Sequence, residues 1–279
     1  VWEDTNNDGV VDPGEKGIGG VTVELEGTAI DGTSIKLTVT TGADGSYSFD
    51  ELPPGTYTVT EPNQPPGTLD GKTVPGSTGG TATTPGTTPS KISTIVVGVN
   101  ETSKDNNFGE VPVGSIAGFV YNDSNDDGIK QNDEGGYAMI DVVLTGTDDL
   151  GNPVNVQGVT DAQGHYVFQN LRPGTYIVTE PTQPAETLNG LTTAGSIDGV
   201  KSGAKVTGKE TVPSQIDGIV LKPGNNSVDN NFGEIGDSPD MLVSKSSNTV
   251  KFTVNTVATY TIRVRNGGQK PSFGEYIVK

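Results

Sequence analysis

The sequence predicts an all-β chain of tandem antiparallel β-sandwich modules, each about the size of an immunoglobulin-like domain. One observation is an alternation with period two. Val21, Val23 and Leu25 alternate with polar residues, which is typical of half-buried antiparallel strands. A second is that no window shows the spacing of an amphipathic helix. The third is an internal repeat of the sequence.

The repeat has a shift of 119 residues over most of its length. It places Gly55–Pro62 on Gly174–Pro181, with Gly-Thr-Tyr, Val-Thr-Glu-Pro in common. Near Ser77 the second copy gains five residues, so that Asp105–Glu110 matches Asp229–Glu234 at a shift of 124. Such an insertion indicates a surface loop. In the first copy this loop lies in the stretch 76–90, which is rich in Gly, Thr and Pro.

These shifts predict three units: residues 1–111, 112–235 and 236–279. The second copy opens with a strand-like run, Gly114–Tyr121, which has no counterpart before Val1, so we expect the first module to lack its opening strand. The last 44 residues alternate as strands but are short for a free-standing sandwich. We therefore expect an incomplete third sandwich-type domain there.

Turn residues separate the predicted strands in both copies. Ala43–Ser46 and Ala162–His165 are expected to form hairpin connections. Pro54-Gly55 and Pro173-Gly174 predict type II turns, in which proline supplies the fixed φ and glycine the positive φ.

Composition excludes several function classes. The net charge of −18 disfavours nucleic-acid binding, and the absence of cysteine excludes disulfides, thiolate metal sites and a cysteine nucleophile. No apolar run approaches the roughly 18 residues needed to cross a bilayer, so we expect no membrane insertion. The single histidine, His165, matches Ser46 in the other copy and is expected at an exposed hairpin edge. We therefore do not expect an enzyme.

The most specific local pattern is the loop of residues 4–15, called loop 1 below. It has oxygen-bearing side chains at positions 1, 3, 5 and 9, glycine at position 6 and glutamate at position 12, as in a calcium-binding loop. A hard cation needs six to eight converging oxygens, and position 7 contributes a main-chain carbonyl. The predicted ligands are Asp4, Asn6, Asp8, Val10, Asp12 and Glu15.

The second copy carries the same pattern at residues 123–134, called loop 2. Position 9 is an amide here, which removes one charge from a ligand that is often water-mediated. The predicted ligands are Asp123, Asn125, Asp127, Ile129, Gln131 and Glu134.

An Asn, Asp and Gly-rich turn with solvated charges is the alternative reading of each loop. Two loops spaced alike favour Ca²⁺ as the cofactor instead. The flanks are β-like and no amphipathic helices bracket the loops, so a sensor that opens a groove is not expected. We expect the ion to act as a structural staple.

Several further motifs recur together with these loops. They are the Trp2/Tyr121-x-Asp start, the Gly-x-Tyr-x-Phe hairpin, the Leu-x-Pro-Gly-x-Tyr-x-Val turn and strand, and the closing Asp-x-Asn-Phe-Gly. With them, residues 1 to about 235 resemble the B-repeat modules of serine-aspartate-repeat surface adhesins, relatives of the collagen-adhesin B-type, transthyretin-like sandwiches. The tail from Asp240 resembles the opening strands of other bacterial surface repeats.

The resemblance implies calcium-rigidified spacer modules in an extracellular protein of the bacterial cell surface, with neighbouring modules as partners. It also implies extra calcium ions at acidic groups outside the main loops, for which Asp105 and Asp229 are candidates. Relatives often carry a Lys–Asn isopeptide bond promoted by a buried glutamate, and the segment from Glu61 resembles that glutamate segment. The strands Val21–Glu26 and Ile140–Thr145 lack the required lysine, so we do not expect the bond.

Three functions follow as expectations. The leading one is a calcium-stabilised stalk or spacer module of a surface adhesin or extracellular fibre. The second is a subunit of a self-assembling filament or surface layer, in which identical subunits join by strand addition. The third is a ligand-binding adhesin domain whose long loops, 67–93 and 186–216, contact an unidentified host or matrix ligand, although those loops offer no aromatic platform for a glycan.

Overall fold

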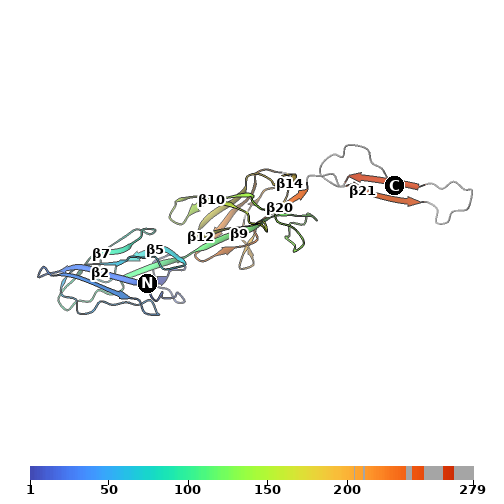
Figure 1. Cartoon of the computed structure of the whole chain (residues 1–279). Helices are drawn as coiled ribbons and strands as arrows, with labels where there is room; N and C mark the ends of the chain where they lie inside the picture. The colour runs from blue at the N-terminus through green and yellow to red at the C-terminus, as the bar shows by residue number, and fades with distance from the viewer. Residues whose placement is uncertain (204, 210, 237–240, 248–259, 267–279) are drawn as a thin grey trace, which may run out of the picture.

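The computed structural model describes residues 1–203, 205–209, 211–236, 241–247 and 260–266, and these residues form strands, turns and loops without a helix. The sandwich that ends at Pro112 is called module 1 and the sandwich from Gly114 to Gly236 is called module 2, and the two lie end to end (Figure 1). The predicted all-β class is confirmed. Of the expected third domain, β21 (Met241–Ser247) and β22 (Tyr260–Asn266) form an antiparallel hairpin, and the remainder lies outside the described residues.

Module 1 consists of a five-stranded sheet packed on a three-stranded one. The larger sheet has the order β3 (Ser34–Thr40), β2 (Thr22–Ala29), β4 (Gly55–Glu61), β7 (Ser90–Val97) and β6 (Thr81–Ala82). The smaller sheet has the order β1 (Trp2–Glu3), β8 (Asn107–Pro112) and β5 (Thr68–Val74).

Module 2 repeats this plan with a larger second sheet. One sheet has the order β11 (Pro153–Val159), β10 (Asp141–Asp148), β13 (Gly174–Glu180), β18 (Ser214–Leu221) and β17 (Lys205–Val206). The other has the order β12 (His165–Leu171), β9 (Gly114–Asn122), β20 (Asn231–Gly236) and β14 (Thr187–Thr193), with β19 (Asn226–Ser227) beside β9. The inserted loop carries the short hairpin β15 (Ser196–Ile197) and β16 (Val200–Lys201).

The predicted alternation places the core between the sheets. Val23, Leu25, Tyr57 and Val59 are buried in module 1, while the residues between them face outward. Most strand pairs are antiparallel, but β1 runs parallel to β8, and β9 runs parallel to β20 and β19. The opening strand of each module therefore points toward the same end as its closing strand.

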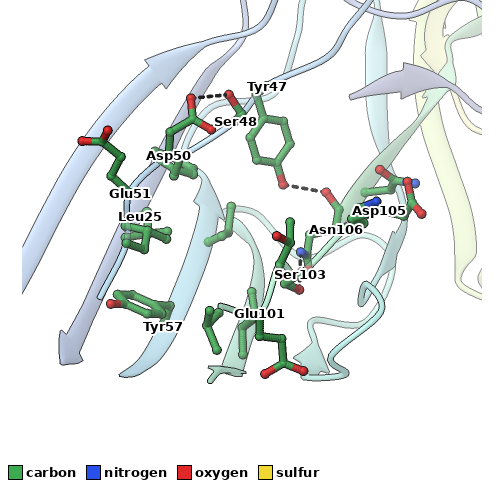
Figure 2. Close-up of a pocket in the computed structure, with 18 of the residues that line it drawn as sticks. Leu25, Tyr47, Ser48, Asp50, Glu51, Tyr57, Glu101, Ser103, Asp105 and Asn106 are labelled. Atoms are coloured by element: carbon green, nitrogen blue, oxygen red, sulfur yellow. Dashed lines mark hydrogen bonds between the residues drawn. The ribbon is translucent and has the colours of Figure 1, made fainter. Parts of the chain in front are cut away.

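One sequence expectation fails in module 1. The hairpin connection at Ala43–Ser46 turns as predicted, but Tyr47 and Phe49 do not lie in a strand, whereas their counterparts lie in β12. In module 2 the counterparts Tyr166 and Phe168 pair with Gly118 and Ile116 of β9, whereas β1, which matches the end of β9, is only two residues long and pairs with β8. A groove of about 910 Å³, lined by residues 45–52 and 97–107 among others, lies beside Tyr47 (Figure 2).

The two Pro-Gly turns also differ from expectation. Gly55 and Gly174 are the first residues of β4 and β13 and are not in the positive-φ region, whereas Glu51 and Asn170 just before them are, at φ of 56° each. A Cβ on Gly55 would lie 2.5 Å from the main-chain oxygen of Thr28. Glycine is required because two backbones approach closely, and not because of its φ.

Candidate metal centre

Loops 1 and 2 follow the opening strand of each module, at the end toward which the closing strand points. The main-chain nitrogen of Asp4 donates to the oxygen of Glu110 in β8 at 2.8 Å, and that of Asp123 donates to Glu234 in β20 at 2.9 Å. The parallel pairing thus holds position 1 of each loop against the last strand of its module. Both aspartates are fully buried.

Position 1 organises the turn of loop 1. The carboxylate of Asp4 accepts hydrogen bonds from the main-chain nitrogens of Asp8 at 3.1 Å and Gly9 at 2.8 Å. Gly9 has φ of 82°, and a Cβ there would lie 3.1 to 3.3 Å from Lys72 and Val74, so both its φ and its surroundings favour glycine. Loop 2 repeats these contacts at Asp123, Asp127 and Gly128.

Three further predicted ligands of loop 1 meet at one point. The amide of Asn6 donates to a carboxylate oxygen of Asp8 at 3.0 Å and to one of Asp12 at 2.9 Å. In loop 2, Asn125 and Gln131 both donate to one oxygen of Asp127, at 2.9 and 2.7 Å. Positions 3, 5 and 9 are therefore neighbours in both loops, joined by amide nitrogens that donate to carboxylates. A bound cation would replace these contacts, because it needs oxygen ligands.

The carboxylate at position 12 of loop 1 is already hydrogen-bonded, whereas a free ligand would have open acceptor positions. The Glu15 carboxylate accepts hydrogen bonds from the nitrogen and hydroxyl of Thr5, from the Trp2 indole and from the nitrogen of Asp12, at 2.7 to 3.0 Å. These four bonds occupy its four acceptor positions. A cation bound through Glu15 would replace some of them.

Without a cation, the ionised forms of the buried aspartates in the two loops are disfavoured. Burial raises the pKa of Asp4, and the nearby Glu15 and Asp8 carboxylates raise it further, against the two hydrogen bonds from Gly9 and Asp8 that lower it. Burial likewise raises the pKa of Asp123. Burial also opposes ionisation of Glu15, but its four hydrogen bonds outweigh this and lower its pKa. A bound cation would relieve the repulsion between these carboxylates.

The donor set fits a hard cation. It consists of carboxylate, amide and main-chain oxygens, and the amide oxygen of Gln131 is buried without a donor among the described residues. Across the part of the chain that the structure describes, no three acidic or histidine side chains converge closely enough to hold a metal by themselves. A cation would thus depend on amide and carbonyl oxygens as well. The carbonyl ligands Val10 and Ile129 remain predictions.

Sequence reasoning missed a second acidic feature that recurs in both modules. Glu61, the last residue of β4, is buried beside Glu110 within β8, and Glu180 and Glu234 are buried in the same way in module 2. Gln64 donates to Glu110, and Gln183 donates to Glu180 at 3.0 Å. No described amide, hydroxyl or main-chain group donates to either oxygen of Glu61 or of Glu234, so the hydrogen bond within each pair depends on a protonated carboxyl. Period two gives a signal for this feature, since Glu61 shares the inward face of Tyr57 and Val59.

Burial is the main cause of the raised pKa values in each pair. It raises the pKa of Glu61 to about 7, and together with the Glu61 charge it raises that of Glu110 to about 10. Module 2 behaves alike, with Glu180 at about 7 and Glu234 at about 10. Each pair therefore retains protons at pH values at which exposed glutamates are ionised.

The duplicated motifs and loops can be compared with known proteins. The family model described as "SdrD B-like domain" matches residues 1–109 and 114–232, which is most of the chain. The chain belongs to the SdrD B-like domain family. The expected resemblance to B-repeat modules is thereby confirmed.

Two relatives of this SdrD B-like chain are named as serine-aspartate repeat-containing proteins. Serine-aspartate repeat-containing protein F of Staphylococcus epidermidis is 37% identical over 178 residues, covering 64% of this chain and 10% of that protein. Serine-aspartate repeat-containing protein D of Staphylococcus aureus strain Newman is 31% identical over 236 residues, covering 83% of this chain and 16% of that protein. The chain thus spans only a tenth to a sixth of the length of these relatives.

Among solved structures, the minor pilin GBS52 of Streptococcus agalactiae aligns with 84% of the SdrD B-like chain and 93% of its own, at 12% identity and a TM-score of 0.30. The shaft pilin SpaA of Lactobacillus rhamnosus GG aligns with a TM-score of 0.32 at 10% identity, over 81% of this chain and 91% of that one. No helix in the described residues is long and apolar enough to span a membrane.

Proposed function

We propose that this chain is a calcium-stabilised spacer segment of a bacterial cell-surface adhesin or extracellular fibre, with two structural cation sites at loops 1 and 2. The supporting observation is the duplication. The side chains at positions 3, 5 and 9 are hydrogen-bonded to one another in both loops, at the same end of each module. The predicted cation ligands lie in loops at the ends of the modules. An ion bound there would link the opening strand of a module to its closing strand, which is a structural role.

Membership of a family whose named relatives are serine-aspartate repeat proteins supports the location and the spacer role. The chain has no disulfide to staple its modules. If each site has the affinity of extracellular calcium modules, about 0.1 to 1 mM, a tenfold excess of calcium stabilises a module by about 1.4 kcal/mol. That is a large fraction of the stability of a small domain.

The test is thermal unfolding of the full chain in calcium and in chelator, for the parent and for Asp8→Ala and Asp127→Ala. We expect calcium to raise the melting temperature of each parent module by about 5 °C or more. Each variant should lose that increment in its own module only. Asp50→Ala, which removes an exposed acid outside the loops, is the matched control and should keep both increments. Equal melting in calcium and chelator would refute the proposal.

A further inference from the structure

Module 2 reaches across the junction and contacts loop 1. The amide of Asn7, at position 4 of the loop, donates to the Asp149 carboxylate at 2.8 Å. Arg172 holds the same carboxylate with Nε at 2.6 Å and Nη2 at 3.2 Å. The third nitrogen, Nη1, donates to the main-chain oxygen of Asp70 in module 1 at 2.8 Å. One arginine therefore joins its own module, through Asp149, to the end of module 1.

This contact is largely shielded from water. The side chains of Arg172 and Asp149 are only 12% and 18% exposed. Beside them Leu150 packs on Gly86 so closely that a Cβ on the glycine would lie 2.7 Å from the leucine methyl. A bidentate arginine–carboxylate pair with low exposure has fixed geometry and is weakly screened by salt. Only Val113 separates β8 from β9, so the covalent linker also restricts the junction.

Loop 1 is tied to the same region from within module 1. Lys72 in β5 donates to the main-chain oxygen of Asp8 at 3.2 Å. Two residues earlier in β5, the carboxylate of Asp70 accepts from Ser90 at 2.5 Å and from the nitrogen of Thr87 at 2.9 Å. Strand β5 thus supports loop 1 on one side and supplies the arginine acceptor on the other. A shift of loop 1 would move Asn7 away from Asp149.

The junction contacts are specific to this pair of modules. The counterparts of Asp149 and Arg172 in module 1 are Ile30 and Pro53, which carry no charge. The counterpart of Asn7 in loop 2 is Asp126, which pairs with Lys209 of its own module. The residue at position 4 of loop 1 therefore contacts module 2, whereas the residue at position 4 of loop 2 contacts its own module.

We propose that docking of module 2 and cation binding at loop 1 are coupled through Asn7 and the Asp149–Arg172 pair, whereas loop 2 binds independently of this junction. This inference rests on the proposed function, since it requires a cation at loop 1. Such coupling is reciprocal, so docking raises the cation affinity of loop 1 and the cation narrows the range of angles between the modules.

The experiment is calorimetric calcium titration of the full chain. Asp127→Ala silences loop 2 and leaves loop 1 to be measured, while Asp8→Ala does the reverse. Adding Arg172→Ala should weaken calcium at loop 1 by about fivefold in the first background and leave loop 2 unchanged in the second. Arg172→Lys keeps the charge without the planar fork and should give an intermediate loss. Lys209→Ala is the matched control, because it removes the position-4 contact of loop 2 and should spare loop 1.

A second measurement reports the geometry. Small-angle X-ray scattering of the parent should show a narrower distribution of intermodule distances in calcium than in chelator. Arg172→Ala should remove most of this difference, although its melting curve shows both modules folded. If calcium binds the parent but Arg172→Ala changes neither loop, or both equally, the coupling is wrong and the proposed function stands. If the parent binds no calcium, the proposed function itself is wrong.

Discussion

Replacing Glu110 by glutamine should stabilise module 1 at alkaline pH. Glu110 and Glu61 are buried together, and burial with the neighbouring charge raises the pKa of Glu110 to about 10. An unfolded glutamate ionises near pH 4.5. The folded state therefore binds more protons than the unfolded state between these values. Stability from this group is fully present below pH 4.5 and is lost as the pH rises toward the folded pKa.

The size of the effect follows from how steeply the free energy of unfolding changes with pH. Each retained proton lowers the free energy of unfolding by about 1.4 kcal/mol per pH unit within that window. From pH 4.5 to pH 8 this gives an upper value of about 5 kcal/mol, and relaxation with water entry reduces it to roughly 2 to 3 kcal/mol. Glutamine carries no charge and can donate its amide hydrogen to Glu61 in place of the protonated Glu110 carboxyl.

The assay is urea unfolding of the full chain at pH 5 and pH 8, at constant calcium. Glu110→Gln should gain about 2 to 3 kcal/mol over the parent at pH 8 and little at pH 5. Glu234→Gln should do the same in module 2, where the pair recurs. Glu26→Gln, at an exposed glutamate paired with Lys36, is the control and should leave stability nearly unchanged at both pH values. Equal stabilisation at both pH values, or destabilisation at pH 8, would refute the argument that buried Glu110 keeps its proton.

Two further substitutions test the local geometry by thermal unfolding. Trp2→Phe removes the indole donor to Glu15 and should destabilise module 1 by about 1 to 2 kcal/mol, in chelator as well as in calcium; an unchanged melting temperature would show that the bond contributes nothing. Gly55→Ala places a Cβ 2.5 Å from the oxygen of Thr28 and should cost at least 2 kcal/mol, whereas Gly67→Ala, with open space but φ of 82°, should cost about 1 kcal/mol; equal costs would contradict the close-approach argument.

The sequence predicted those parts of the fold that depend on local pattern. Alternation located β2 and β4 and the face that each buries. It did not predict that Tyr47 and Phe49 lie outside a strand while Tyr166 and Phe168 lie in β12. Local sequence is nearly the same in the two copies, and in module 2 the strand β12 pairs with β9, more than forty residues away in the chain.

The candidate metal centre shows the same division. Spacing alone selected the residues of both loops and required glycine at Gly9 and Gly128, because oxygens at alternate positions and a sharp turn are properties of a short segment. Spacing assigned Glu15 to the cation, and the tertiary structure adds four hydrogen-bond donors around its carboxylate. Those donors come from residues whose positions depend on the folded loop and on the strand before it.

The sequence by itself determined that the chain is a tandem of β-sandwich modules with two acidic loops, because periodicity, glycine and carboxylate spacing act over a few residues. Only the tertiary structure decided which acids meet and which modules touch. Glu61 reaches Glu110, and Arg172 reaches Asp70, across separations of 49 and 102 residues. Such pairs depend on strand register and on the single-residue junction at Val113, which no local pattern encodes.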